Sequence, residues 1–498
     1  MGHIVQGKIG RIIRNVNRTI KSGFMFSLLF LCLTMSSSCI GDKVTVEIDP
    51  AAPGAQIQDD FLGISVEWGS VPDYLGDGSG GLRPAVVTLM RAFEAEDHRL
   101  SVRIGGNSQD LAWWNPQGAT PPSGVTINIG PAHLATLAAL AEVLQTRLIL
   151  GLNLAIDDPA LAVGLIDAAY DAIPGNAIQA FEMGNEPDLY RTEGPRRGLG
   201  YGWNAYLADM EAFHDNIAEQ VPPSTPFAAT AIANRSWLGN MPGFCEREKN
   251  RLALVTTHIY PFTNCYNLAP SAEALLTEYA TSGIGASYKT LAAAAHAQGL
   301  AYRMDEMNSV SCGGADGVSN VYAAALWGAD IAFQLAAAGL DGINFHTPSR
   351  YAVFSLDASG VPVVYPLYYG MRFFSLATAS HGRLLPLSIK TPARVHAWAT
   401  LGEDGAVRVA LINLNRKTDK VVYLHIPGWS ESASLVRLQA PSLTAKTGLT
   451  LGGLTWDGST EGHPLGIAAS EPVAYEAGSY KVSLPALEAV VVKVSPAL

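Results

Sequence analysis

Two glutamates stand where a carboxylate pair could carry out acid–base and nucleophilic chemistry. Glu186 lies in residues 181–187 (FEMGNEP), which end one predicted strand, and Glu306 lies in residues 303–308 (RMDEMN), which end another. Two carboxylates that face each other across a cleft are the working pair of glycoside hydrolysis, one as general acid and the other as nucleophile in the retaining version. An isolated glutamate more often caps a helix or pairs with an arginine. The interpretation therefore depends on the elements that carry the two residues.

Apolar, β-rich runs alternate with Ala- and Leu-rich helical stretches from about residue 61 to about residue 377. Near-continuous apolar strands separated by helices are typical of a parallel sheet covered by helices. Eight such strands predict an α/β fold, a (β/α)8 TIM barrel, whose active site lies at the C-terminal ends of the strands. The predicted strands are 61–68, 100–106, 147–154, 180–186, 226–232, 252–260, 300–308 and 339–346.

The pattern changes at about residue 378 to short alternating strands without helices. This change predicts a C-terminal antiparallel β-sandwich domain, with strands at 394–401, 407–414, 420–424, 435–439, 480–484 and 489–494. An early strand at 43–48 precedes the barrel and could join the sandwich. We expect a signal segment over 1–38, an N-terminal strand in 39–57, the catalytic barrel over 58–377 and the sandwich over 378–498.

Composition and the N-terminus predict an exported, folded protein. Of the 498 residues, 48% are hydrophobic and 15% charged, which excludes a disordered chain, and the net charge of −11 argues against nucleic acid as a partner. Basic residues up to Lys21 precede an apolar run at 24–35 that is too short to span a bilayer. Small residues at 36–38 then precede Cys39. The predicted destination is the periplasm, the extracellular space or the cell surface, after cleavage behind the serines or with a lipid anchor on Cys39.

Cysteine usage leaves the disulfide pairing open. With Cys32 and Cys39 set aside, an exported chain has three cysteines left and can form one disulfide. The competing pairs are Cys265 with Cys312 and Cys245 with Cys265. No spacing of cysteine and histidine typical of a zinc site occurs, so no metal is predicted.

Several segments resemble known glycosidases. Residues 184–187 (GNEP), together with a glutamate on the seventh strand, resemble the clan A retaining glycosidases. Residues 103–107 (RIGGN), 150–153 (LGLN) and 257–260 (THIY) are similar, in order and placement, to glycoside hydrolase family 79, the heparanase-like β-glucuronidases. The resemblance extends from about residue 44 to the C-terminus.

The resemblance implies a retaining exo-β-glucuronidase that hydrolyses terminal β-D-glucuronides of glycans or glycosides by double displacement and needs no cofactor. Glu186 corresponds to the acid/base and Glu306 to the nucleophile. Asn185 would bond the sugar 2-hydroxyl, and Tyr260 would hold the nucleophile or the glycosyl oxygen. The remaining residues implied to bind substrate are Glu67 at sugar hydroxyls, Tyr351 near the uronate carboxylate, Asn107 and Gly313.

One departure from the family concerns the substrate. The related enzymes resemble one another in a Tyr-Gly-Gly after the nucleophile that holds the glucuronate carboxylate, whereas residues 309–314 here read SVSCGG. The tyrosine is missing, although the glycines that let a backbone approach an anion remain. Arg350 could compensate with a charge-assisted bond. Two alternatives therefore stay open: a retaining β-glycosidase for a neutral sugar, and a non-catalytic carbohydrate-binding surface protein, against which the two intact glutamates argue.

Overall fold

Eight parallel strands close into a barrel in the computed structural model, which describes residues 42–192, 197–390 and 394–496. Each strand pairs in parallel with its neighbours in chain order, and the last pairs with the first. The predicted (β/α)8 fold is confirmed, while the predicted signal segment 1–38 and Cys39 lie outside the described residues. The barrel strands are β2 (Leu62–Glu67), β3 (Ser101–Gly105), β6 (Leu148–Leu152), β7 (Ile178–Met183), β8 (Phe227–Ile232), β9 (Leu254–Ile259), β11 (Ala301–Met307) and β13 (Gly342–Thr347).

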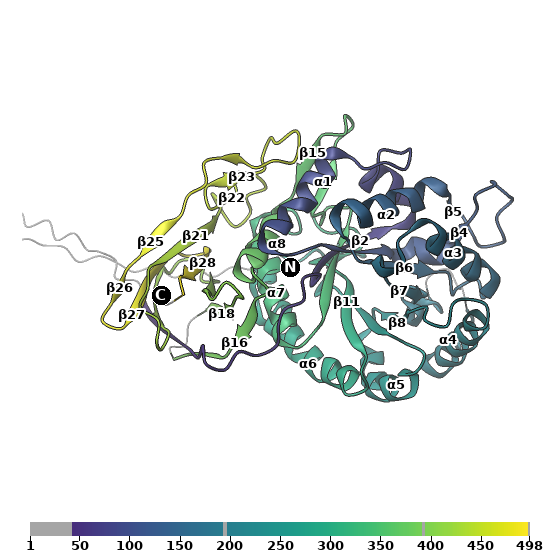
Figure 1. The fold of residues 1–498 in the computed structure, drawn as a ribbon, viewed down its shortest axis with the longest axis horizontal. Coiled ribbons are helices and arrows are strands. Elements are labelled where there is room, and N and C mark those ends of the chain that lie inside the picture. The colour runs from purple at the N-terminus through teal and green to yellow at the C-terminus, as the bar shows by residue number, and fades with distance from the viewer. Residues whose placement is uncertain (1–41, 193–196, 391–393, 497–498) are drawn as a thin grey trace, which may run out of the picture. The chain divides into compact units, whose positions relative to one another are not determined.

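Helices surround the barrel (Figure 1). Several begin with proline in the first turn, where the missing N–H would have no helical partner. No helix within the described ranges is long and apolar enough to cross a membrane. The helices are α1 (Pro84–Arg91), α2 (Pro131–Leu144), α3 (Pro159–Ala172), α4 (Trp203–Ala218), α5 (Met241–Glu248), α6 (Ser282–His296), α7 (Tyr322–Ala337) and α8 (Pro366–Ala377).

Two sheets form the terminal domain, and an apolar core lies between them. The first runs in the order β17 (Leu387–Ile389), β1 (Asp42–Ile48), β20 (Lys420–His425), β27 (Ser479–Leu484), β26 (Tyr475–Glu476). The second runs in the order β16 (Arg383–Leu385), β18 (Val395–Leu401), β19 (Val407–Asn413), β28 (Ala489–Val494), β21 (Ala433–Gln439), β22 (Thr450–Leu451), β23 (Leu454–Thr455), β24 (Leu465–Gly466), with β25 (Glu471–Val473) also on β21. The early strand β1 pairs in parallel with β20, an exception in an otherwise antiparallel domain.

One sheet of the terminal domain packs its outer face against the apolar cluster of the barrel and its helices. Successive side chains of a strand point to opposite faces. On β19, Val409 and Leu411 pack between the two sheets, while Ala410 and Ile412 belong to the apolar cluster of the barrel and its helices. Because this sheet covers the helices with its outer face, α7 is buried on nearly all sides.

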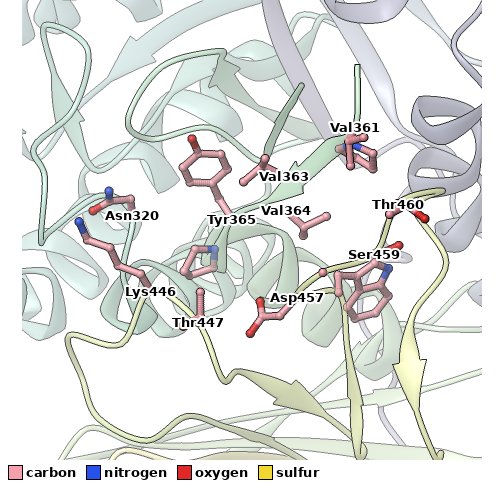
Figure 2. Close-up of a pocket in the computed structure, with 14 residues that line it drawn as sticks. Asn320, Val361, Val363, Val364, Tyr365, Lys446, Thr447, Asp457, Ser459 and Thr460 are labelled. Atoms are coloured by element: carbon pink, nitrogen blue, oxygen red, sulfur yellow. The ribbon is translucent and has the colours of Figure 1, made fainter. Parts of the chain in front are cut away.

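A hollow of about 580 Å³ lies between a β-hairpin and the terminal domain. The hairpin consists of β14 (Phe354–Leu356) and β15 (Pro362–Val364), and the terminal domain contributes the segment 446–460. Figure 2 shows Lys446 and Asn320 at one end and Ser459 and Thr460 at the other. Lys446 and Asn320 both bond Asp316, at 2.6 and 2.8 Å. Since these polar groups already have protein partners, the hollow resembles a seam between packed elements more than a binding site.

Replacing Phe333 on α7 with alanine should lower the free energy of unfolding by about 3–5 kcal/mol, since it removes a large buried ring. Phe333 stacks on Trp398 of β18, with ring centroids 4.8 Å apart, so the loss should weaken both domains together. Denaturant unfolding measures the change. Val363→Ala, at a position 44% exposed, is the control and should have little effect. If the Phe333→Ala variant and the wild type had the same midpoint of denaturant unfolding, packing of the terminal domain against the barrel helices at Phe333 would be contradicted.

Candidate active site

A cavity of about 340 Å³ opens at the C-terminal ends of the barrel strands. It is lined by Glu67, Asn107, Glu186, Leu189, Ala233, His258, Ile259, Tyr260, Cys265, Glu306, Ser311, Cys312, Gly313, His346 and Tyr351. All but one of the predicted site residues are in this set. The exception, Asn185, is buried next to the cavity, with its Nδ2 3.5 Å from Oδ1 of Asn107.

A tight turn after β7 places Glu186. Gly184 and Glu186 both have positive φ, 80° and 47°, which reverses the chain directly after the strand. The N–H of Glu186 donates to the carbonyl of Ala231 at 3.0 Å, and a short 3-10 turn over Pro187–Leu189 follows. The carboxylate of Glu186 then lies 2.9 Å from Nδ1 of His258 on β9.

A β-bulge places Glu306. In a regular strand, Asp305 and Glu306 would point to opposite faces. The pairing of β11 with β9 shifts register between Arg303 and Glu306, and the pairing with β13 shifts between Met304 and Met307. Because a bulge re-aims side chains, the carboxylates of Asp305 and Glu306 both approach Arg103, at 3.6 and 2.7 Å.

The fully buried guanidinium of Arg103, on β3, connects the groups beneath the cavity. Its Nη1 donates to Oε2 of Glu306 at 2.7 Å, and its Nε and Nη2 donate to Oε2 of Glu182 at 2.9 and 2.7 Å. Nη2 also donates to Oδ1 of Asn185 at 2.9 Å. Bonds between ionised partners are short and strong. Arg103 therefore fixes the carboxylate of Glu306 and the amide of Asn185 in one frame.

The surroundings of Glu306 keep it ionised. Burial alone would raise its pKa, but the attraction of His346, His258 and Arg103 and the hydrogen bond from Tyr260 outweigh burial and hold the pKa at about 2. The hydroxyl of Tyr260 donates to Oε1 at 2.9 Å. Glu306 is thus a carboxylate at neutral pH, as a nucleophile must be.

Its neighbour Asp305 is in the opposite state. Burial, followed by repulsion from Glu182, raises the pKa of Asp305 well above its usual value. Glu182 is equally buried, but the guanidinium of Arg103 outweighs that burial and lowers its pKa. Like charges this close cannot both ionise, so Asp305 keeps a proton. Oδ1 of this neutral acid lies 3.5 Å from Nε2 of His258, whose other nitrogen contacts Glu186.

Among the residues that the structure describes, two groups of side chains could by distance hold a metal ion. In the first, oxygen or nitrogen atoms of Glu182, His258 and Asp305 lie within 4.8 Å of one another. Arg103 and the hydroxyl of Thr256 already bond the two oxygens of Glu182, so a proton fits this group better than a cation.

The second group contains the two predicted catalytic residues. Oxygen atoms of Glu186 and Glu306 and a ring nitrogen of His258 lie within 4.8 Å of one another. Retaining glycosidases separate their carboxyl groups by about 5–5.5 Å and inverting ones by about 6.5–9.5 Å. A separation this short is closer to the retaining geometry than to the inverting one.

Acceptors for sugar hydroxyls lie at Glu67, which His346 separates from Glu306 with a ring nitrogen 3.6 Å from each carboxylate. The carboxylate of Glu67 accepts the backbone N–H groups of Asn107 and Ser108 at 3.2 and 2.8 Å. Burial raises its pKa, but His346 and the Ser108 bond outweigh burial, and the net pKa is lowered. An ionised Glu67 with free acceptor capacity suits hydroxyl groups.

The loop that departs from the family, residues 309–314, lies at the rim of the cavity. Cys265 and Cys312 form a disulfide that lines the cavity, and Cys245 is buried with a free thiol. Arg350, by contrast, is exposed and does not line the cavity. Its charge acts on Asp316, outside the cavity. Lys446 and Asn320 lower the pKa of Asp316 most, and Arg350 adds a smaller lowering. The hypothesis that Arg350 holds a carboxylate therefore has no support in this geometry.

The sequence interpretation assigned no role to the groups that hold the catalytic pair, namely Arg103, Glu182, His258, Asp305 and His346. A signal for some of them was available. Arg103, Glu182 and Asp305 are charged residues inside strands that are buried on both faces. Since a buried charge must be compensated by a partner, these three charges could have been matched with one another from their strand positions alone.

The comparisons with known proteins confirm the resemblance. Residues 397–491 match the glycosyl hydrolase family 79 C-terminal beta domain. The chain is 27% identical to a β-glucuronidase of Aspergillus niger, with 88% of each chain covered, and 25% identical to a β-glucuronidase of Neurospora crassa, with 78% of each covered. A solved 4-O-α-L-rhamnosyl-β-D-glucuronidase of Fusarium oxysporum 12S has the same fold, with a TM-score of 0.77 at 22% identity over 90% of this chain and 100% of that one.

Replacing Arg103 with methionine should lower the free energy of unfolding by about 3–5 kcal/mol at pH 7, because it leaves buried carboxylates without their cation. Arg103 lowers the folded-state pKa of Glu182 and Glu306, so its contribution is present above their unfolded value of 4.5. That contribution fades as the pH falls toward about 2, the folded value of Glu306. Denaturant unfolding at pH 7 and pH 3.5 should therefore show a smaller deficit at the lower pH.

The matched control is Arg416→Met, which breaks an exposed pair with Glu273 at 3.0 Å and should cost less than about 1 kcal/mol. Equal deficits for Arg103→Met at the two pH values would contradict the assigned charge states.

Proposed function

Since the chain is a glycoside hydrolase of the family 79 type, we propose that it is a retaining exo-β-glucuronidase that hydrolyses terminal β-D-glucuronides by double displacement. The observation that carries the proposal is the pair of Glu186 and Glu306, with oxygens within 4.8 Å of each other at the end of a barrel. The names of the curated relatives supply the sugar. The substrate class is a glucuronide-terminated glycan or glycoside.

In the first step the ionised Glu306 attacks the anomeric carbon. Glu186 gives its proton to the glycosidic oxygen, the bond from that oxygen to the anomeric carbon breaks, and a glycosyl ester of Glu306 forms. Arg103 and Tyr260 each bond one oxygen of Glu306, so the carboxylate cannot rotate away from the sugar. Esterification removes its charge, and Arg103 keeps Glu182 as its counter-ion.

In the second step Glu186, now ionised, takes a proton from a water molecule that attacks the anomeric carbon. The ester bond breaks, Glu306 recovers its charge, and the configuration of the sugar is retained. The 2.9 Å contact with His258 holds Glu186 in place for both steps. The proton on Asp305 leaves His258 facing a neutral acid instead of a second carboxylate.

A neutral β-glycoside is the second candidate substrate, favoured by one observation. None of the described residues that line the cavity is a lysine or an arginine, while three are glutamates. The two lining histidines already lie beside the three glutamates, so recognition of a uronate carboxylate would fall to neutral donors, namely the hydroxyl of Tyr351 and the backbone N–H of Gly313. The intact catalytic pair argues against a purely carbohydrate-binding role.

We also propose that the protein is exported, after cleavage behind Ser38 or with a lipid anchor on Cys39. The disulfide between the exposed residues Cys265 and Cys312 supports this proposal, because such bonds persist in oxidising compartments.

Purified protein should release p-nitrophenol from the aryl β-D-glucuronide much faster than from the aryl β-D-glucoside. Glu306→Gln should lower kcat at least roughly a thousandfold, because an amide cannot form the glycosyl ester. Glu219→Gln, an exposed glutamate at the end of α4, is the matched control and should keep full activity. Preference for the glucoside would support the neutral-sugar candidate instead. An active Glu306→Gln variant would contradict the assigned nucleophile.

The pH dependence of kcat/KM should respond to His346. Its attraction helps to lower the pKa of Glu306, so His346→Gln should raise that pKa. Because the ionised form is the active one, the acid limb of kcat/KM should move to higher pH. The alkaline limb should move less, since it does not depend on ionising Glu306. An exposed histidine, His463→Gln, serves as the control, and an unmoved acid limb in His346→Gln would contradict the electrostatic role of His346.

A further inference from the structure

A carboxylate bound in this cavity would depend on donors that must be held in position. The described lining residues include Glu67, Glu186 and Glu306 but no lysine or arginine. A neutral N–H or O–H dipole attracts an anion only at short range and in the right direction. Whatever fixes such donors therefore controls how well a charged sugar is distinguished from a neutral one.

Three consecutive residues after β12 (Val310–Ser311) have a left-handed backbone. Cys312, Gly313 and Gly314 have φ values of 58°, 80° and 77°. Within the described part of the chain, the N–H groups of Gly313 and Gly314 have no hydrogen-bond partner. Successive N–H groups in a turn can form a concave anion site, called a nest, and here Cys312 and Gly313 line the cavity while Gly314 is buried. We call Cys312–Gly314 the rim nest.

The carbonyl groups of Gly313 and Gly314 accept hydrogen bonds from neighbouring segments. The carbonyl of Gly313 accepts the hydroxyl of Ser349 at 2.8 Å and the N–H of Arg350 at 3.2 Å. Within one peptide plane the N–H points opposite to the C=O, so the N–H of Gly314 points away from these contacts. The carbonyl of Gly314 accepts Nδ2 of Asn264 at 3.2 Å.

The rim nest is tied to the neighbouring loop by a short clamp. Strands β10 (Phe262–Thr263) and β12 pair in parallel, and the N–H of Asn264 donates to the carbonyl of Ser311 at 3.3 Å. The hydroxyl of Ser311 donates to Oγ1 of Thr263 at 2.9 Å. The disulfide from Cys265 to Cys312 then closes the clamp at the first residue of the nest.

We propose that the Cys265–Cys312 disulfide and Asn264 are specificity-positioning residues, which hold the N–H groups of the rim nest where the carboxylate of the sugar binds. The proposal rests on the proposed glucuronidase function and adds how the missing tyrosine is replaced, by a covalent clamp in place of a hydroxyl. Neither cysteine bonds Glu186 or Glu306. The clamp therefore acts on KM for charged sugars and not on the chemical steps.

The double variant Cys265→Ser/Cys312→Ser tests the clamp. It keeps every backbone donor but releases the loop, so affinity for a carboxylate falls because the donors must be ordered on binding. KM for the aryl glucuronide should rise roughly tenfold. The kcat should stay within about threefold of wild type, because the catalytic pair is untouched. KM and kcat for the aryl glucoside should change much less than KM for the aryl glucuronide.

Two further measurements separate the clamp from general damage. Asn264→Ala leaves the disulfide in place but removes the bond to Gly314, and it should raise KM for the glucuronide in the same direction. A phosphine reductant, which is oxidised as it converts the exposed disulfide to two thiols, should reproduce the double variant in the wild-type protein. The Cys245→Ala variant, which lacks the buried thiol of α5, should keep the wild-type KM and remain sensitive to reductant.

Each outcome separates this proposal from the function on which it rests. A wild type that prefers glucuronides, with unchanged KM in the double variant, overturns the clamp alone. Equal losses for both substrates would also overturn the clamp, because they indicate a disturbed cavity and no carboxylate-specific role. A wild type without any preference for glucuronides overturns the proposed function and the clamp together.

Discussion

The buried guanidinium of Arg103 is the interaction on which the rest of the site depends. A cation inside a barrel is tolerated only if carboxylates compensate it, and Glu182 and Glu306 do so at 2.7 Å each. After His346 and His258, the same contact helps to lower the pKa of Glu306, and it fixes the direction of the carboxylate. Folding and chemistry thus use one ion-pair network, so the reactive carboxylate needs no separate support.

Much of the fold follows from the sequence pattern. The eight apolar runs and the alternating strands after residue 378 gave the barrel and the terminal domain, because periodicity reports directly which faces are buried. The positions of Glu186 and Glu306 at strand ends also follow from it. The bulge in β11 does not, since nothing in 303–308 marks where the register shifts. Likewise, the pairing of Cys265 with Cys312 depends on two loops meeting in space.

The barrel strands and the loops at the rim of the cavity have different roles. The catalytic pair is held by residues on strands β3, β7, β9, β11 and β13, where packing and ion pairs leave little freedom. In the proposed function, the choice of sugar falls to Tyr351 and to the loop of Cys312 and Gly313, which line the cavity from outside the barrel strands. Loops carried on a rigid scaffold are the usual place for specificity. This division explains why motifs pointed to the paired glutamates and to Tyr351 and Gly313, while the suggested role of Arg350 found no support in the geometry.

Trapping the covalent intermediate tests the central claim most directly. In a 2-deoxy-2-fluoro-β-D-glucuronyl fluoride, the fluorine at C2 slows both steps. The anomeric fluoride is a good leaving group, so the glycosyl ester forms faster than it is hydrolysed and should accumulate. Peptide mass spectrometry should then find one glycosyl group, carried by Glu306. Release on incubation with an acceptor, with return of activity, would complete the evidence for double displacement. A label on another residue, or inhibition without any covalent adduct, would contradict Glu306 as the nucleophile held by Arg103.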